Sequence, residues 1–259
     1  MATSLTNKIL RKEYNDLFDS CIIQESRMKE IEQLIEKFLE LEPRYRSVAD
    51  LLGMPWYIIA IIHRLECGSD FKLHLHNGDP LTAKTTHVPA GRPLKGNPPF
   101  TWEQSAKDAL TLMQFSAWKD WTIAGTCYKI ETYNGMGYRK HGIYSPYLWG
   151  SSNHYKQGKY VQDGVWSDVA VSKQIGAAIL LRRLKEKKLI EFQEDKTRVE
   201  SQINNVLYAP NTYNKSAEIL QKFLNSVGAT LLVDGKAGKM TSDAFHKFSG
   251  YYLKGDPRG

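Results

Sequence analysis

The segment between Pro55 and Gly68 constrains the fold of this chain more than any other. Proline is favoured in the first turn of a helix and glycine directly after the last turn, so this spacing predicts one helix between them. Glu66 lies in the last turn of that helix. The segment is so rich in apolar side chains that we expect the helix to be largely buried: Ile58, Ile59, Ile61, Ile62 and Leu65.

Helical periodicity recurs in four other parts of the chain. Apolar residues three and four positions apart predict helical structure over residues 8–42, 101–118, 119–133 and 168–189. Pro43 is expected to close the first of these regions. Thr101 is expected to cap the start of the second, because a threonine side chain accepts hydrogen bonds from the free amides of a first helical turn.

Residues 69–100 differ from the helical segments, because proline, glycine and histidine are crowded there. Apolar and polar residues alternate over residues 71–75, which predicts a strand. Residues 77–80 (Asn-Gly-Asp-Pro) are a strong turn signal, so we expect a short β-hairpin at the surface. The predicted fold class is therefore mainly α, of the α+β type, with a small β-hairpin.

The composition is that of a globular protein. The chain has 259 residues, of which 42% are hydrophobic and 24% charged. It has no uninterrupted apolar stretch of about 18 residues, so we expect no stable insertion into a membrane. The first residues lack an apolar core followed by a small-residue cleavage site, and no signal peptide is predicted. The three cysteines are widely spaced, which predicts free thiols and neither disulfides nor a zinc site.

The net charge of +7 favours polyanionic partners such as nucleic acids, anionic membranes or anionic wall polymers. The basic residues are spread along the chain rather than clustered. One run, at residues 182–188, alternates with Leu184 and Glu186 and is typical of a solvated helix end. We therefore predict no nucleic-acid partner.

The chain is predicted to hold two domains. Residues 191–211 are polar and weakly patterned, and we interpret them as a linker between residues 1–190 and residues 212–259. In the second of these, apolar residues at helical spacing precede a double-glycine turn at residues 233–238, and Thr241 then caps a further helix. We expect a small three-helix domain there.

The position of Glu66 favours a particular chemistry. The end of a helix carries partial negative charge, and apolar neighbours such as Leu65 and Phe71 would desolvate the carboxylate, so both effects raise the pKa of Glu66. A carboxyl group that stays protonated near neutral pH suits glycosidic bond cleavage, in which an acid gives a proton to the leaving oxygen.

The expected hairpin offers groups for the other face of the sugar. Asp79, in a polar exposed turn, is the candidate catalytic partner of Glu66. Thr85 or Thr86 is an alternative that would position a water molecule. This chemistry needs no cofactor, and we predict none.

Three segments resemble the goose-type lysozyme and lytic transglycosylase superfamily, over roughly residues 50–185. Glu66 at its helix end, followed by Ser69 and Phe71, is similar to the Glu-Ser-x-Phe signature of that superfamily. Residues 131–138 contain Tyr-Asn-Gly and are similar to its Tyr-Asn-x-Gly motif. Residues 112–114 (Leu-Met-Gln) echo a third segment, which lies in a loop in the superfamily but falls within a predicted helix here.

This resemblance implies a lysozyme-like catalytic domain, in a form typical of a divergent group of phage endolysins. It implies that Glu66 is the catalytic acid and that Tyr133 and Asn134 line the sugar site. A phage lysin accumulates in the host cytoplasm without a signal peptide, and reaches the bacterial wall through membrane holes or inside a virion.

Aromatic residues are dense between residues 133 and 166. Sugar rings present apolar C–H faces that stack on tyrosine and tryptophan, and such aromatic side chains are common at binding surfaces. Half of these residues are expected in the core. The candidates for the surface, and hence for sugar binding, are Tyr138, Tyr144, Tyr147 and Trp149.

The C-terminal segment resembles the peptidoglycan-binding domain found on many wall hydrolases. The matching positions are Leu220, Gln221, Leu224, Asn225, Gly228, Val233, Asp234, Gly235, Gly238, Thr241, Ala244 and Phe248. Ala237 departs from the pattern, because a large apolar residue usually precedes that glycine. The resemblance implies that this module binds the wall.

The leading hypothesis is that a monomer hydrolyses the N-acetylmuramic acid to N-acetylglucosamine bond of peptidoglycan glycan strands by direct attack of water. A lytic transglycosylase, in which a hydroxyl of the sugar itself attacks, is the first alternative. A zinc-dependent wall amidase or peptidase using His74, His76 and His87 is the second, although no zinc motif accompanies these histidines. A non-catalytic binder of wall or nucleic acid is the third.

Overall fold

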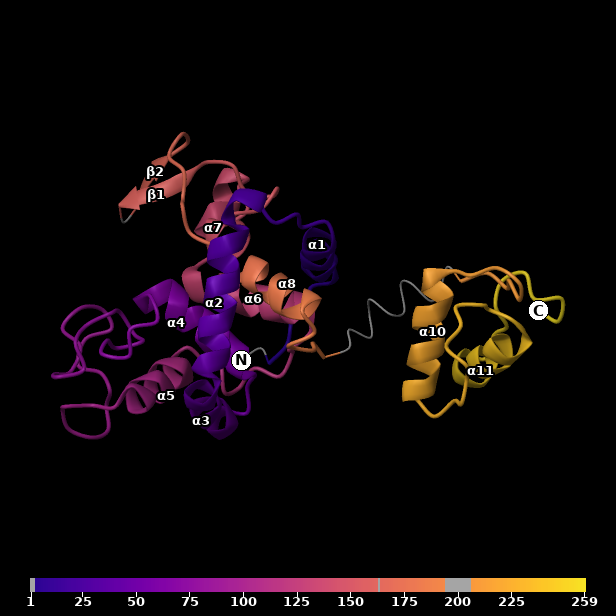
Figure 1. The fold of residues 1–259 in the computed structure, drawn as a ribbon, viewed down its shortest axis with the longest axis horizontal. Helices are drawn as coiled ribbons and strands as arrows, with labels where there is room; N and C mark the ends of the chain where they lie inside the picture. The colour runs from indigo at the N-terminus through magenta and orange to yellow at the C-terminus, as the bar shows by residue number, and fades with distance from the viewer. Residues whose placement is uncertain (1–2, 163, 194–205) are drawn as a thin grey trace. The chain divides into compact units, whose positions relative to one another are not determined.

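The computed structural model of this protein describes residues 3–162, 164–193 and 206–259 (Figure 1). The chain divides into two compact units, Met1–Gln193 and Glu194–Gly259, which we call the N-terminal and the C-terminal unit. Each unit has its own cluster of buried hydrophobic residues. The described structure is mainly helical with one small two-stranded antiparallel sheet, so the predicted fold class is confirmed.

The N-terminal unit contains most of the regular structure. Its elements are α1 (Lys8–Asp19), η1 (Glu25–Arg27), α2 (Met28–Glu40), α3 (Glu42–Leu52), α4 (Trp56–Cys67), α5 (Trp102–Leu112), α6 (Ile123–Asn134), η2 (Gly137–His141), α7 (Pro146–Trp149), β1 (Lys159–Gln162), β2 (Val165–Ser167) and α8 (Ala177–Glu186).

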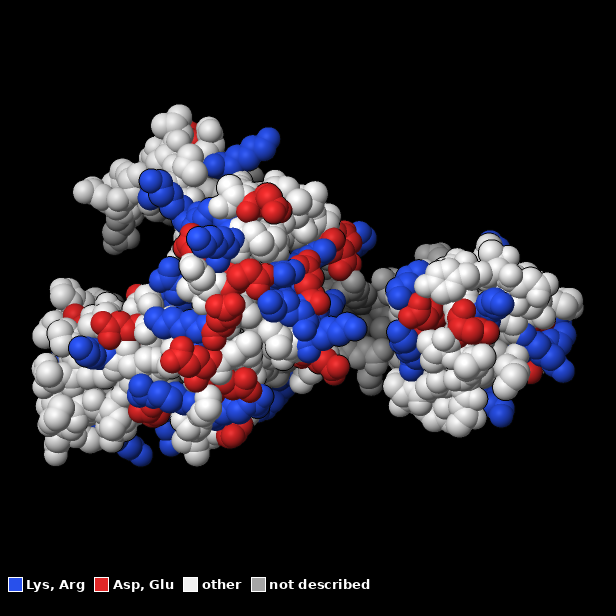
Figure 2. Space-filling view, viewed as in Figure 1, with Lys and Arg blue, Asp and Glu red and all other residues white. Residues whose placement is uncertain are grey.

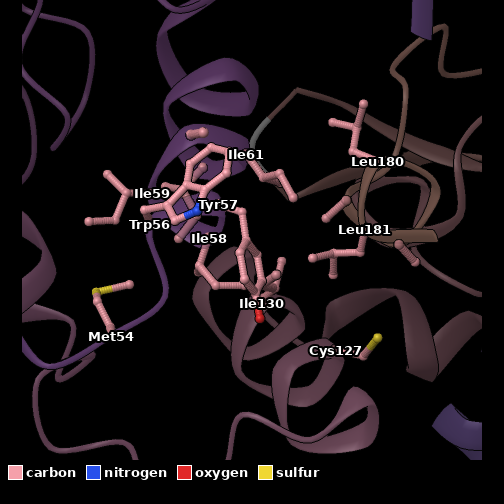
Figure 3. Close-up of a cluster of buried hydrophobic side chains, with 14 of the residues drawn as sticks. Met54, Trp56, Tyr57, Ile58, Ile59, Ile61, Cys127, Ile130, Leu180 and Leu181 are labelled. Carbon is pink, nitrogen blue, oxygen red and sulfur yellow. The ribbon is translucent and has the colours of Figure 1, made fainter. Parts of the chain in front are cut away.

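Helix α4 is largely buried in the N-terminal unit and ends at Gly68, as predicted. Pro55 is its N-cap, and Gly68 ends it in the left-handed region with φ of 63°. Most side chains of α4 are buried, and Figure 3 shows Tyr57, Ile58 and Ile61 on the side of the helix that faces Ile130 of α6 and Leu181 of α8. The C-terminal end of this buried helix therefore holds Glu66 in a fixed place.

The structure changes several of the helical predictions, and the helix expected over residues 168–189 is the shorter α8. Residues 8–42 form two helices, α1 and α2, separated by a connection that contains η1. Pro43 lies in the first turn of a third helix, α3, where a missing amide costs no hydrogen bond. The sequence pattern signalled the end of α2 but not the start of α3.

None of the described helices alone has the length and apolar composition of a membrane span. Helices α3 and α4 meet these criteria only when taken together, and the chain bends by 113° between them.

The β-hairpin lies elsewhere than predicted. Residues 71–80 form an irregular loop with a single bridge between Leu73 and Pro80, so the strand expected at residues 71–75 is absent from this described segment. Proline cannot donate to a strand ladder, which limits pairing beyond this bridge. The hairpin is formed by β1 and β2, where Tyr160 pairs with Trp166 across the strands. Aromatic pairs of this kind stabilise antiparallel strands.

The described part of the C-terminal unit contains two helices, α10 (Lys215–Ser226) and α11 (Lys239–Ser249). No third helix occurs between residues 206 and 259, where three had been expected in the domain. The end of the predicted linker belongs to this unit, because Val206 is buried and Ala209 bridges Ala237. Residues 194–205, the middle of that linker, lie outside the described residues.

Candidate active site

A cavity of about 250 Å³ opens where the C-terminal ends of α4, α5 and α6 meet the loop between α4 and α5. It is lined by Glu66, His76, Pro89, Ala109, Leu112, Met113, Tyr133 and Asn134. The glutamate, the tyrosine and the asparagine that the sequence singled out are therefore brought together from α4 and α6. Apolar side chains from α5 complete the wall.

Glu66 is held by a buried tyrosine. The hydroxyl of Tyr147 on α7 donates a hydrogen bond of 2.6 Å to Oε1 of Glu66, and Tyr147 is only 4% exposed. Glu66 is an exposed residue that solvent reaches from the cavity, yet the protein atoms around its carboxyl displace part of its hydration and raise its pKa. The hydrogen bond from Tyr147 acts in the opposite direction and limits the rise. The pKa of Glu66 is therefore raised, in the direction predicted from the sequence.

Tyr133 and Asn134 form the cavity wall contributed by α6. Burial raises the pKa of Tyr133, and the nearby carboxyl of Glu66 adds to that rise, so Tyr133 stays a neutral hydroxyl. Its ring lies 5.7 Å from that of Phe115 and 6.5 Å from that of Tyr147, measured between centroids. Asn134 is exposed at the end of the helix. One aromatic and one amide group are thus available beside the acid.

The Leu-Met-Gln segment lies at the end of α5 rather than within a helix. Helix α5 stops at Leu112, and Gln114 takes a left-handed conformation with φ of 59°. The prediction of a helix through residue 118 was therefore wrong. Lys129 of α6 donates to the carbonyl of Met113, which fixes the turn against the neighbouring helix. Leu112 and Met113 consequently reach the cavity.

Asp79 does not line the cavity and is buried rather than exposed as predicted. Its Oδ2 accepts hydrogen bonds from the amides of Thr86 and His87, at 2.7 and 3.0 Å, and its Oδ1 lies 2.6 Å from Nδ1 of His87. These contacts with His87 and Thr86 hold the pKa of Asp79 well below its usual value. The carboxylate thus stabilises the loop between α4 and α5 by hydrogen bonds within that loop, and Asp79 is not among the residues that line the cavity.

Thr85 also acts within this loop. Its hydroxyl donates to the carbonyl of Pro89 at 2.6 Å and accepts from the amide of Arg92 at 2.9 Å. Thr85 is 3% exposed and does not line the cavity. Both bonds of the hydroxyl are used inside the protein, so it is not placed to hold a reacting water. Its contact with Pro89 instead positions a residue of the cavity wall.

The three histidines considered as zinc ligands are each bonded to groups of the protein: His74 and His76 both contact the hydroxyl of Ser105, and His87 contacts Asp79. His74 is buried between Ser105 and the carbonyl of Ala83, and the side chain of His87 is 80% exposed. Nε2 of His76 lies 2.8 Å from Asp108 of α5, and its imidazole has no solvent exposure. Within the described residues, no group of three or more His, Cys, Asp or Glu side chains is arranged to hold a metal ion.

The contact between His76 and Asp108 was not anticipated from the sequence. Asp108 also pairs with Arg92 at 2.7 Å, so one carboxylate of α5 joins two positions of the loop between α4 and α5. Burial lowers the pKa of His76, and the hydrogen bond to Asp108 opposes this. Nothing in the spacing of these residues signals the contact, because the partners are 32 and 16 positions apart.

Two of the predicted sugar-binding aromatic residues lie away from the cavity. Trp149 is 1% exposed, and its ring meets His154 edge-on in the core, so its prediction as a surface residue was wrong. Tyr138 packs against Tyr160 and Trp166 of the hairpin. Tyr147 is also buried, and its observed contact is with Glu66.

The C-terminal unit has a groove of about 570 Å³ between the end of α10 and α11. Leu224, Leu231 and Ala244 form an apolar part of its lining. Asp243 and Lys247, one turn apart on α11, add charges of opposite sign.

No protein-family model, curated protein sequence or solved structure matches this chain. The functional assignment therefore depends on the residues themselves.

Proposed function

We propose that this protein cleaves the N-acetylmuramic acid to N-acetylglucosamine bond of bacterial peptidoglycan, with Glu66 as the general acid. The observation that carries the proposal is the setting of Glu66. Its carboxyl faces a cavity shared with Tyr133 and Asn134, while burial raises its pKa and Tyr147 fixes its direction. A protonated carboxyl group in a partly apolar cavity is what proton donation to a glycosidic oxygen requires.

The sequence of events follows from these positions. Glu66 gives its proton to the oxygen between two sugars as that bond breaks, and becomes a carboxylate. The hydroxyl of Tyr147 then donates to a charged acceptor, a stronger hydrogen bond than the one it makes to the neutral acid. Tyr133 and Asn134 lie beside the acid, where a ring face and an amide would contact the sugar.

The residues that line the cavity limit which groups could act as the nucleophile. Among its lining residues Glu66 is the one carboxylate, and Asp79 is engaged in the loop. A covalent route through a second carboxylate thus has no nucleophile among these residues. Two routes remain: attack by water, which yields a reducing sugar, and attack by a hydroxyl of the muramic acid itself, which yields an anhydro sugar. This second route makes lytic transglycosylase activity our alternative proposal.

The test is loss of turbidity of purified peptidoglycan with the wild type and Glu66→Gln. We expect Glu66→Gln to lower the rate by about 10²–10⁴-fold, since a general acid contributes that much. Glu25→Gln, an exposed glutamate of η1, is the matched control and should keep the wild-type rate. Unchanged activity in Glu66→Gln would exclude the proposal. Mass analysis of the fragments separates the two routes, because an anhydro end lacks one water.

The C-terminal unit is proposed to hold the enzyme on the wall. Its groove between α10 and α11 combines apolar side chains with Lys247 and Asp243, which suits a short peptide with small side chains and charged ends. Such peptides branch from the glycan strand of peptidoglycan. We also propose that the protein is a phage lysin acting from the host cytoplasm or from a virion, and that it works as a monomer without a cofactor.

A further inference from the structure

A cluster of aromatic rings joins η2 to the β1–β2 hairpin. The rings of His141 and Trp166 are stacked, with centroids 3.8 Å apart and planes within 4°. Tyr138 and Tyr160 meet Trp166 edge-on, at 5.4 and 5.1 Å. We call these four residues the hairpin cluster. His141 is exposed and the other three rings are half-buried, so the cluster is not covered by the rest of the protein.

The hairpin cluster is firmly held. Arg139 of η2 donates to Glu131 of α6 at 2.9 Å and to Glu13 of α1 at 2.8 Å, which fastens η2 to the body of the N-terminal unit. A Cβ atom on Gly158 would lie 3.0 Å from the ring of Trp166, so a residue without a side chain lets the ring lie close to the backbone there. A surface of this kind is preorganised, which lowers the entropic cost of binding a ligand.

The cluster follows directly on the cavity wall. Asn134 lines the cavity at the end of α6, and η2 begins at Gly137. In the view of Figure 1, β1 and β2 project from the N-terminal unit on the same side as the loop between α4 and α5, and Figure 2 shows a notch between these projections. The hairpin that carries the rings and the loop that lines the cavity thus lie on the two sides of this notch.

The cavity is too small to hold a polymeric substrate by itself, so such a substrate needs further contacts outside the cavity. Its volume of about 250 Å³ is below the range of about 300–1,000 Å³ that encloses a drug-sized ligand. A glycan strand with several sugars on each side of the cleaved bond must then rest on protein outside the cavity. Aromatic rings suit this role, because the C–H faces of a pyranose pack against them.

We propose that the hairpin cluster binds the glycan strand several sugars away from the cleaved bond, which makes the enzyme prefer long strands. This inference rests on the proposed function and names a second contact for the same substrate. The exposed His141 and the half-buried Trp166 form the contact surface. Asp168 accepts a hydrogen bond of 2.7 Å from the indole of Trp166 and fixes that ring.

The experiment measures binding in the Glu66→Gln background, so that cleavage does not interfere. Peptide-free peptidoglycan glycan fragments of four and of eight sugars are titrated by calorimetry. We expect the longer fragment to bind at least about tenfold more tightly, a difference equal to about 1.4 kcal/mol. His141→Ala and Trp166→Phe should each remove most of this difference. Val169→Ala, an exposed valine outside the cluster, is the control and should retain it.

Trp166→Phe and His141→Ala are chosen because each leaves an aromatic ring in the cluster to support the hairpin. NMR of the backbone amides at positions 160 and 166, which pair across the strands, checks that the hairpin is still folded. Equal affinity for the two lengths, or a length preference that survives both substitutions with the hairpin intact, overturns the inference. Either result is compatible with the proposed function, provided that the wild type cleaves peptidoglycan. Activity that survives Glu66→Gln overturns the proposed function instead, and the titrations still decide whether the cluster binds glycan.

Discussion

Two opposing effects set the pKa of Glu66, and one of them comes from its hydrogen bond with Tyr147. The protein atoms around the carboxyl of Glu66 displace part of its water and raise its pKa, and the hydroxyl of Tyr147 partly offsets this by donating to the ionised form. A general acid acts only when protonated. The cleavage rate should therefore fall as pH rises through the raised pKa of Glu66, which lies above the ordinary glutamate value of about 4.3.

Tyr147→Phe tests this balance. Removing the hydroxyl takes away the group that favours ionised Glu66, so the alkaline limb of the pH–rate profile should move to higher pH. The carboxyl also loses its orienting bond, and kcat should fall by about tenfold or more, since small misplacements of a catalytic group are costly. Tyr251→Phe, at a tyrosine of the C-terminal unit that is 76% exposed, is the control. An alkaline limb that stays in place or moves to lower pH would contradict the assignment.

At the scale of elements, the irregular loop between α4 and α5 forms one wall of the site without regular secondary structure. Its shape depends on Asp79 at one end and on Asp108 of α5 at the other, each of which joins two positions of the loop. A carboxylate that accepts several amide hydrogen bonds is a common way to fix such a segment. The loop therefore holds Pro89 and His76 at the cavity through buried polar contacts rather than through strand pairing.

Asp79→Ala separates a bracing role from a catalytic one. We expect faster amide hydrogen exchange at Thr86 and His87, whose amides lose their acceptor. The activity should fall far less than the roughly 10²–10⁴-fold expected for a general base. Asp50→Ala, at an exposed aspartate of α3, is the control. A loss of activity as large as that of Glu66→Gln, with unchanged exchange, would assign Asp79 to catalysis.

The stabilisation of the loop by the Asp79 carboxylate should depend on pH in a defined direction. The pKa of Asp79 is lower in the folded protein than the ordinary value of about 3.9, so its contribution to stability is fully present above that value. It is lost as pH falls towards the lowered pKa, because the carboxyl becomes protonated. The protection of the Thr86 and His87 amides, measured as the exchange rate relative to that of an unstructured peptide at the same pH, should therefore fall in acid in the wild type and much less so in Asp79→Ala.

At the scale of the whole molecule, the chain consists of two units with separate cores, to which we propose separate tasks. The core of the N-terminal unit surrounds α4, and that of the C-terminal unit is built around Leu220, Phe223 and Leu224 of α10. Units with independent cores are able to fold separately. Joining a catalytic and a binding unit keeps the catalytic site near the wall, which raises the effective concentration of substrate.

A chain ending at Gln193 tests this division. We expect its circular dichroism and cooperative thermal unfolding to show a folded helical unit, and its kcat/KM on soluble glycan fragments to match that of the full chain. Its retention on sedimented peptidoglycan should drop by about tenfold or more, because avidity is lost. Equal retention of the two chains would contradict a wall-binding role for the C-terminal unit.

Local signals determined much of this protein. The pair Pro55 and Gly68 bounded α4, and the capping box of Thr101 and Gln104 marked the start of α5, because caps act on the residues next to them. The direction of the pKa shift of Glu66 was predicted from the sequence, but Phe71, expected beside the carboxyl, packs against His63 and Trp102 instead. Only the tertiary structure placed Tyr147 against Glu66, buried Trp149 and turned Asp79 into the loop. These contacts join residues far apart in the chain, and no local pattern encodes which side chains meet when helices pack.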